Sequence, residues 1–357
     1  MSTSRRRTSP AELNRATLAR QLLLDRSTAG PLDAIERLAG LQAQVPRPPY
    51  IGLWSRLAGF EVQHLHDLVH GKHAVRATMM RGTIHLMSTR DFLALRTALE
   101  PLLSAGIKKF PPAVATHART LMPATFETVR AKLAKKYPRL DHKALGYAVK
   151  THLPLVLVPT ADARWAYPGN ADFHDAETWL GAPFAERSIE LLLRRYLAAF
   201  GPASLKDAQA WSGLRNLGPV FEAMRDSLVV LDADGRELFD LPEAPRPGAD
   251  VPAPVRFLPE YDNLLLAYAD HARLIDNARR PSLTSNNGIV AATFLVDGRI
   301  AGTWSLARTT TTATLALVPF SNLAKAARSA LEVEGEALLR WHEPDAKVFR
   351  VRVARAR

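Results

Sequence analysis

The 357-residue sequence contains no cysteine. Disulfide bonds, zinc sites built on thiolates and cysteine nucleophiles are therefore excluded, and the composition fits a reducing compartment. Long apolar runs are also missing, because no segment approaches the roughly 18 residues that a membrane-spanning helix needs. The segment MSTSRRRTSPAELNRATLARQ is basic but has no apolar core, so we expect neither a secretory signal nor contact with a membrane.

Common signatures of nucleotide and cofactor chemistry are absent as well. The sequence has no G-x-x-x-x-G-K-[ST] phosphate loop, no G-x-G-x-x-G after a predicted strand and no G-x-S-x-G nucleophile elbow. His64 and His66 form an H-x-H pair near His70 and His73, but no further ligand follows at a recognisable spacing. We therefore expect no cofactor and no metal site, with these histidines on a solvated helix surface.

The excess positive charge lies entirely in the first part of the chain. Residues 1–150 hold 24 Lys and Arg against 10 Asp and Glu, whereas residues 151–357 hold 23 against 25. Such asymmetry indicates a surface that faces a polyanion, and nucleic acid is the usual candidate. A generally basic proteome is the alternative, although a bias of that kind would not stop in the middle of the chain.

A pattern of helices followed by two strand-like runs occurs three times. Apolar periodicity predicts the helices, and alternation around short turns predicts the strands. Three helices and a two-stranded wing form the winged-helix arrangement, in which one helix can enter a DNA groove. The sequence thus predicts an α+β fold with tandem winged-helix modules at residues 1–104, 105–180 and 181–245. The predicted helices cover residues 11–24, 32–43, 62–70, 125–136, 141–152, 184–200, 204–214 and 217–226, and the predicted hairpins cover residues 74–88, 153–169 and 227–238.

Two short motifs support the third module. Ser204 is followed three residues later by Asp207, which approximates a capping box at a helix start. Asp234-Gly235 is a strong signal for a two-residue hairpin turn.

The last part of the chain has a different composition. Residues 242–256 are rich in proline and alanine and predict a linker. We expect residues 246–357 to form a mixed α/β unit, rich in strands and packed on the modules. Its predicted elements are a hairpin over residues 288–306 around Asp297-Gly298, a strand at 309–317, a helix at 322–340 and a strand at 347–353.

The stretch GLQAQVPRPPY at residues 40–50 places two neutral amides, Gln42 and Gln44, where a predicted helix ends. Two helical residues at this spacing point about 200° apart. The prolines that follow predict extended backbone, so the helix would unwind at Gln44 and both amides could face one cavity. On spacing alone, two exposed residues at a helix end are the plainer interpretation.

The stretch GLQAQVPRPPYIGLWSRLAGF (40–60), followed by MMRGTIHLMSTRDF (79–92), resembles the AlkZ/YcaQ type of winged-helix DNA glycosylase. The family motif is glutamine, a hydrophobic residue and glutamine, and this chain has Gln42-Ala43-Gln44. Further likeness appears at RFLPEYDNLLLAYADHARLI (256–275) and VDGRIAGTW (296–304), so the resemblance spans most of residues 10–350.

The resemblance implies that Gln42 and Gln44 are catalytic in the hydrolysis of N-alkylated purines, and it extends to the unhooking of interstrand crosslinks. The expected partner is double-stranded DNA with alkylated purines, and no protein partner is indicated. We accordingly expect a monomeric, cytoplasmic, nucleoid-associated enzyme.

Other side chains are candidates for supporting roles. Arg47, Arg56, Arg76 and Arg81 lie in the basic first module and could contact phosphates, or serve only solubility. His85 could lie near the pocket or in the core. Asp262 could orient a glutamine, activate water or cap a turn. The hairpin at 296–302 could enter a groove, with Arg299 on phosphate or the minor groove, or be an ordinary turn.

A regulator or architectural protein that binds DNA without catalysis is the alternative from another class, because winged helices are more often binders than enzymes. Three fused modules with a C-terminal unit would make an unusually large monomeric binder. A regulator should prefer one operator sequence, whereas a repair enzyme should prefer a lesion in any sequence.

Overall fold

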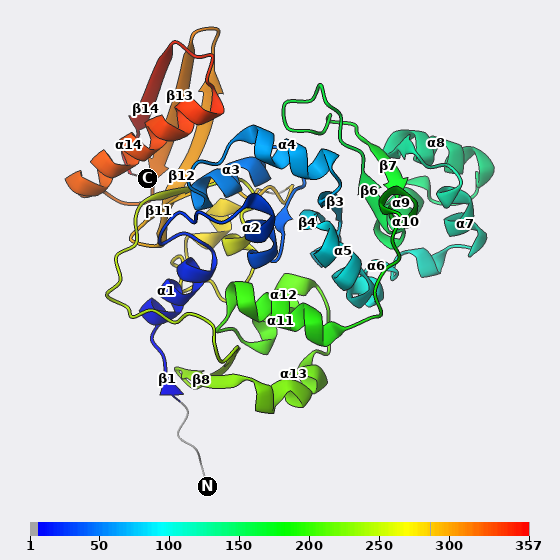
Figure 1. The fold of residues 1–357 in the computed structure, drawn as a ribbon, viewed down its shortest axis with the longest axis horizontal. Coiled ribbons are helices and arrows are strands. Elements are labelled where there is room, and N and C mark those ends of the chain that lie inside the picture. Colours follow the sequence, from blue (N-terminus) through cyan, green and yellow to red (C-terminus); the bar gives the residue numbers. More distant parts are fainter. Residues whose placement is uncertain (1–5, 286, 357) are drawn as a thin grey trace.

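Three β-sheets, with helices between and around them, make up the described part of the chain in the computed structural model, which covers residues 6–285 and 287–356. The expected α+β class is confirmed. Figure 1 shows the C-terminal sheet at upper left, a helical lobe at right and a third group of helices below. No helix in the described ranges has both the length and the apolarity needed to cross a membrane.

One six-stranded sheet joins the first two predicted modules. Ala77 of β3 bridges Val156 of β6, so the two predicted wings share hydrogen bonds instead of forming separate sheets. The predicted second hairpin strand at 163–169 is wrong, because that segment is a loop and the partner of β6 is β7. In spatial order the strands are β2 (Leu41–Gln42), β4 (Ile84–Ser88), β3 (Ala74–Thr78), β6 (Leu155–Leu157), β7 (Asp172–Asp175) and β5 (Ala124–Thr125).

Gln42 lies in a two-residue strand and Gln44 in the bend after it, so the predicted helix at 32–43 is wrong from residue 38 onward. Helix α2 (Pro31–Arg37) ends early because Ala39 and Gly40 both adopt positive φ, 53° and 84°. A Cβ on Gly40 would lie 2.1 Å from the sulfur of Met87, so this reversal needs glycine. The chain then enters β2.

The prolines after the glutamines start a helix instead of extending the chain. Pro48 and Pro49 are the first two residues of α3 (Pro48–Arg56), where a missing N–H costs no hydrogen bond and the fixed φ suits helix. The predicted extended backbone at these residues is therefore wrong. Around the same sheet lie α4 (Val62–His70), α5 (Thr89–Leu95), α6 (Glu100–Leu103), α10 (Ala176–Leu180) and the 3₁₀ turns η1 (Met80–Gly82) and η2 (Arg96–Leu99). Helix α1 (Pro10–Arg20) packs instead against the later helix at Ile189–Phe200.

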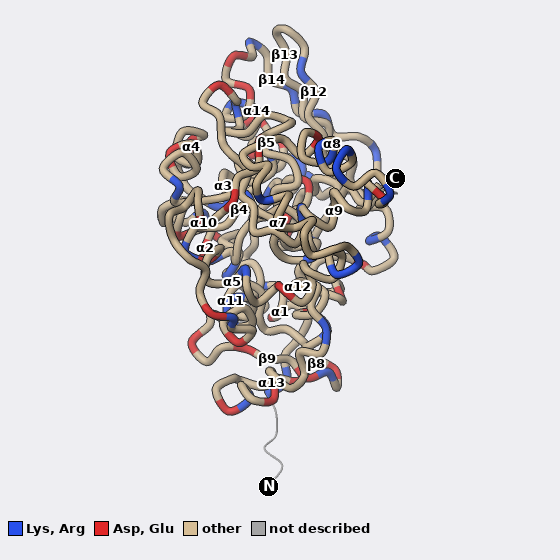
Figure 2. Tube along the Cα trace, turned by 90° about the vertical axis from the view of Figure 1, so that its right-hand side faces the viewer, with Lys and Arg blue, Asp and Glu red and all other residues tan. Residues whose placement is uncertain are grey.

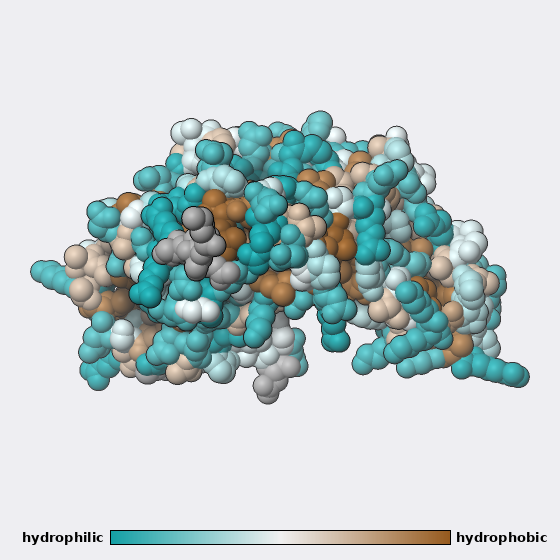
Figure 3. All heavy atoms as spheres, turned by 90° about the horizontal axis from the view of Figure 1, so that it is seen from below, coloured by the Kyte–Doolittle hydropathy of each residue, from teal (hydrophilic) through white to brown (hydrophobic). Residues whose placement is uncertain are grey.

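Residues 105–152 form a separate group of short helices, which we call the basic lobe. It holds ten Lys and Arg against two Asp and Glu, which accounts for most of the positive excess of the chain. The elements of the basic lobe are η3 (Ile107–Lys109), α7 (Ala113–Arg119), α8 (Phe126–Lys136) and α9 (His142–His152). Lys and Arg gather on α8 (Figure 2). A hollow in the surface separates the part of the molecule at right from the main body (Figure 3).

The third predicted module agrees with the structure in its local signals. Ser204 and Asp207 form the expected capping box, and Asp234 and Gly235 both have the positive φ of the expected hairpin turn. The parts are α11 (Ile189–Phe200), α12 (Leu205–Ser212), α13 (Gly218–Met224), η4 (Arg225–Ser227), β8 (Val229–Ala233) and β9 (Arg236–Asp240), and β1 (Arg6–Arg7) pairs in parallel with β8.

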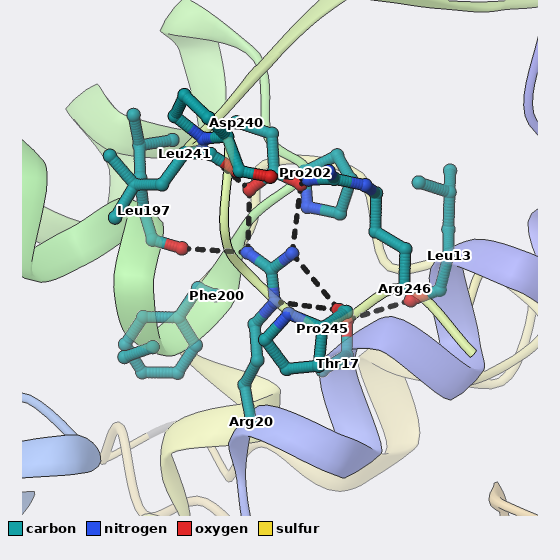
Figure 4. Close-up of polar contacts among 12 residues, drawn as sticks. Leu13, Thr17, Arg20, Leu197, Phe200, Pro202, Asp240, Leu241, Pro245 and Arg246 are labelled. Carbon is teal, nitrogen blue, oxygen red and sulfur yellow. Dashed lines mark hydrogen bonds and ion pairs between the residues drawn. The ribbon is translucent and has the colours of Figure 1, made fainter. Parts of the chain in front are cut away.

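The predicted linker at 242–256 is fastened to a buried ion pair that joins α1 to the last residue of β9. Arg20 donates to both carboxylate oxygens of Asp240, at 2.7 and 2.8 Å, and also to the carbonyl oxygen of Pro245 (Figure 4). Arg246 donates to Asp240 from the linker itself. The segment is therefore an anchored strap and not a free connection.

The C-terminal unit is a five-stranded sheet covered by α14 (Lys325–His342). Its strands in spatial order are β10 (Arg256–Leu258), β11 (Thr293–Val296), β12 (Arg299–Arg308), β13 (Thr312–Pro319) and β14 (Val348–Val353), and the turns η5 (Asn263–Leu265) and η6 (Arg280–Leu283) lie before β11. Buried residues of this sheet, of α3 and of the six-stranded sheet form one hydrophobic cluster. The glutamine segment therefore rests on a rigid core.

The turn between β11 and β12 packs against α1, which favours the ordinary-turn alternative over insertion of this hairpin into a DNA groove. Asn14 donates to the carbonyl oxygen of Gly298 at 2.8 Å, and Arg15 pairs with Asp297. A Cβ on Gly298 would lie 2.5 Å from Leu18. The turn at residues 309–311, between β12 and β13, is exposed instead.

Candidate active site

Both glutamines lie beside β4. Gln42 pairs with His85 in the β2–β4 ladder, and the pairing continues as the Ala43 N–H donates to the Ile84 carbonyl at 2.7 Å. The side-chain oxygen of Gln44 accepts a hydrogen bond from the Ile84 N–H at 3.3 Å. Both side chains are therefore placed by their pairing with β4, Gln42 inside the short strand and Gln44 in the bend that follows it. Gln42 is buried, whereas Gln44 is exposed.

Arg81 holds the amide of Gln42. Its guanidinium donates to the Gln42 side-chain oxygen at 2.8 Å and to the carbonyl oxygen of Trp211 at the end of α12. The residue sits in η1 with a positive φ of 56°, a conformation uncommon for arginine. Burial lowers the pKa of Arg81 to about 10, still far above neutral pH. Arg81 thus fixes the orientation of one amide and places a positive charge beside it.

His85 lies behind Gln42 and is almost fully buried. Its Nδ1 is 3.0 Å from the carbonyl oxygen of Thr83, which can only accept, so Nδ1 carries the proton. Its Nε2 then faces the guanidinium of Arg81 at 3.4 Å. Burial, and secondarily the charge of Arg81, lowers the pKa of His85 to about 3. Both alternatives for His85 therefore hold: it is a core residue, and it borders the glutamine site.

The depressed pKa of His85 predicts a pH-dependent stability. Between the unfolded pKa near 6.5 and the folded pKa of about 3, the unfolded chain binds one proton more than the native protein. The free energy of unfolding therefore falls as pH decreases through this window, by up to about 1.4 kcal/mol per pH unit from this residue. Urea unfolding at pH 7, 6 and 5 should show a shallower pH slope for His85→Gln than for the native protein. His73→Gln, at an exposed position, should keep the native slope; equal slopes for all three proteins would contradict the assignment.

Arg76 shapes the backbone between the two glutamines. Its Nε and Nη2 donate to the carbonyl oxygen of Ala43 at 3.2 and 2.8 Å, and its guanidinium lies 4.6 Å from the ring centre of Tyr167. Only 4 % of Arg76 is exposed, and desolvation lowers its pKa to about 10. The expected phosphate contact of Arg76 is therefore wrong, since its guanidinium is used within the protein.

Arg56 and Asp262 form a fully buried ion pair. The guanidinium donates to both carboxylate oxygens at 2.9 and 3.0 Å, and both side chains are 0 % exposed. The expected phosphate contact of Arg56 is wrong for this reason. Asp262 contacts neither glutamine and instead accepts the Leu264 N–H at the start of η5, which agrees with the turn-capping alternative.

Two neighbours of Asp262 reach the glutamine segment and were not singled out from the sequence. Asn263 donates to the carbonyl oxygens of Gly40 and Leu38, at 2.6 and 3.3 Å, and so holds the turn that leads into β2. Glu260 pairs with Arg47, three residues after Gln44. The residue type of Asn263 alone only weakly indicates this role, because the backbone carbonyl that it binds, that of Gly40, lies 223 residues earlier in the chain.

The remaining candidates stay near the surface. Arg47 is partly exposed, and its phosphate contact remains a prediction. Arg299 is exposed and donates to the carbonyl oxygen of Ala272 at 3.1 Å, so its contact with DNA also remains a prediction. His66 faces the carbonyl oxygen of Arg164, and in the described ranges no group of three or more histidines and carboxylates is placed to hold a metal ion.

The positive charge of the basic lobe favours a polyanionic partner, and comparison with known proteins identifies the class of enzyme. A model of the AlkZ-like DNA glycosylases matches residues 35–341. The chain belongs to this family, and it is a DNA glycosylase.

The chain resembles one curated protein and one solved structure from the same organism. An interstrand DNA cross-link repair glycosylase of Streptomyces sahachiroi is 23 % identical over 318 residues, covering 81 % of this chain and 85 % of the relative. The solved structure of the Streptomyces sahachiroi DNA glycosylase AlkZ superposes with a TM-score of 0.78 at 19 % identity, covering 98 % of this chain and all of the other.

Proposed function

We propose that the protein hydrolyses the N-glycosidic bond of cationic N-alkylated purines in double-stranded DNA, and that crosslinked purines are among its substrates. Gln42 and Gln44 would position the attacking water and stabilise the sugar as it becomes oxocarbenium-like. No cofactor or metal enters this scheme. The tandem winged-helix organisation, its module boundaries, action as a monomer without a protein partner and nucleoid association belong to the same proposal.

The chemistry of a cationic lesion makes two amides sufficient. A purine alkylated at N7 or N3 carries a positive charge, so it departs as a neutral base and needs no strong general acid. The remaining task is to hold one water near C1′ and to favour positive charge on the sugar. Amide oxygens accept hydrogen bonds from that water, and their dipoles point their negative ends at the developing charge.

The contacts of the site carry the proposal. Gln42, Gln44, Arg76, Arg81 and His85 bond to one another, to backbone groups or to an aromatic ring, and no Asp or Glu in the described ranges hydrogen-bonds to any of them. A neutral base would leave as an anion and would need a proton donor, which these contacts do not supply. The proposed enzyme should therefore be selective for labile, cationic lesions.

The exposed edge of the glutamine site, at Gln44 and Val45, supports the proposal that crosslinked purines are substrates. Gln44 is exposed, and Val45 beside it is 44 % exposed. A base tethered to the opposite strand cannot enter a closed pocket, because its linker must pass back to the duplex. The name of the Streptomyces sahachiroi relative, an interstrand cross-link repair glycosylase, points in the same direction.

Base release tests the proposal directly. We expect release of N7-methylguanine from a duplex and no release of uracil or 8-oxoguanine, which are neutral, in otherwise identical duplexes. Released base is measured by mass spectrometry, and the abasic site is detected on a gel after an added abasic-site endonuclease has cut the strand there. A purely DNA-binding regulator would release none of these bases and would instead protect one sequence in a footprint. Release of neutral and cationic bases at similar rates would refute the selectivity argument.

A further inference from the structure

An exposed tyrosine stands between two lysines on α9. Tyr147 is 60 % exposed, although large aromatic side chains usually bury most of their surface. Lys143 lies four residues before it and Lys150 three residues after it, so helical spacing places all three on one face. Lys143 is exposed, whereas the Lys150 ammonium lies 5.3 and 5.5 Å from the ring centres of Phe126 and Phe173. An exposed aromatic ring beside a cation is the arrangement that nucleic-acid-binding surfaces use to stack a base and hold an adjoining phosphate.

The same tyrosine lies close to the glutamine site. Its hydroxyl is 3.5 Å from the place where a Cβ on Gly82 would lie. Gly82 directly follows Arg81, whose guanidinium holds the Gln42 side chain at 2.8 Å. The exposed face of α9 therefore lies beside the turn whose Arg81 holds the buried amide.

Nothing in the described chain uses the end of this side chain. The Tyr147 hydroxyl has no hydrogen-bond partner within residues 6–285 and 287–356, so neither the ring nor the hydroxyl serves an internal contact that explains the residue type. A single exposed apolar residue is common on protein surfaces and by itself means little. Here the exposure coincides with the basic lobe, where ten Lys and Arg face two acidic residues, and a polyanion is the occupant that this charge favours.

We propose that the ring of Tyr147 stacks on the DNA base that borders the excised nucleotide, with Lys143 on the adjoining phosphate. An enzyme that acts on a base in a duplex must first take it out of the stack, and this leaves a neighbouring base without its partner face. An aromatic ring that covers that face stabilises the opened duplex. Tyr147 is thus a positioning residue, and this role rests on the proposed function.

The test uses binding and fluorescence, so that it does not depend on base release. The probe is a duplex with a tetrahydrofuran abasic analogue flanked by 2-aminopurine, whose fluorescence reports stacking of that neighbouring base. We expect Tyr147→Ala to bind this duplex about tenfold more weakly and to lose the fluorescence change that the native protein produces. Tyr147→Phe should retain both, because the ring is kept.

Val333→Ala, at a 73 % exposed position on α14, is the matched control and should behave as the native protein. Thermal unfolding of each variant establishes that it is folded, which the exposure of residue 147 leads us to expect. Native-like binding and fluorescence of Tyr147→Ala, or equal losses in the Ala and Phe variants, would overturn the proposal. A native protein that changes the fluorescence but releases no base would instead refute the proposed function and leave the stacking role standing.

Discussion

Gln42→Ala is expected to slow the release of N7-methylguanine roughly 10²- to 10³-fold, the loss typical when one preorganised polar group at a reacting centre is removed. Gln42 is the better held of the two amides, because Arg81 fixes its oxygen at 2.8 Å and the side chain is 7 % exposed. Because the amide is already oriented, no free energy is spent on reorienting it as charge develops on the sugar. Single-turnover rates with enzyme in excess over lesion-containing duplex measure this step without product release.

Two comparisons make the Gln42 result specific. Gln63→Ala removes a glutamine whose amide bonds only to Asp67 on the exposed side of α4, and it should leave the rate unchanged. Gln44→Ala should also lose rate, and its binding to the uncleaved duplex should stay near native. Rates are compared well below each unfolding temperature, since losing the Gln42 oxygen deprives Arg81 of a partner. A Gln42→Ala enzyme that retains more than a third of the native rate would remove Gln42 from the mechanism.

The glutamine motif shows what the sequence could and could not predict. The family resemblance, and not the spacing, selected Gln42 and Gln44 as the candidate site. The predicted element was wrong because helical periodicity at 32–43 was overridden by the positive φ of Ala39 and Gly40. Proline after the motif was interpreted as a chain extender, although the same residue fits the first turn of a helix equally well. Local patterns here were compatible with two elements, and tertiary packing chose between them.

Local turns and helix caps were predicted more accurately than hydrogen bonds and ion pairs between residues far apart in the sequence. Ser204, Asp207 and the Asp234-Gly235 turn each depend on neighbours within three residues, and all were confirmed. The contacts of Arg56 and Arg81 depend on Asp262 and Trp211, which are 206 and 130 residues away. The sequence therefore suggested phosphate contacts for several arginines that are in fact buried or partly buried and bonded within the protein, among them Arg56, Arg76 and Arg81.

The buried pair of Arg56 and Asp262 should dominate the stability of the region that carries the site. Asp262→Ala leaves the guanidinium of Arg56 buried without a counter-ion, since both side chains are 0 % exposed. We expect a loss of about 3–5 kcal/mol in the free energy of unfolding, measured in urea. The pair joins α3 to the segment whose next residue, Asn263, holds Gly40 before β2, so base release should fall as well.

A double variant separates the cost of an unpaired charge from the worth of the pair. Arg56→Met combined with Asp262→Leu removes both charges, so it should be more stable than Asp262→Ala despite carrying two changes. Glu336→Ala breaks an exposed pair with Arg340 on α14 and should cost at most about 0.5 kcal/mol. If Asp262→Ala costs no more than Glu336→Ala, then Arg56 is solvated or neutralised in the variant and the pair does not hold the site in place. If instead the double variant is stable but slow in base release, the pair contributes to the position of the glutamine segment beyond its contribution to folding.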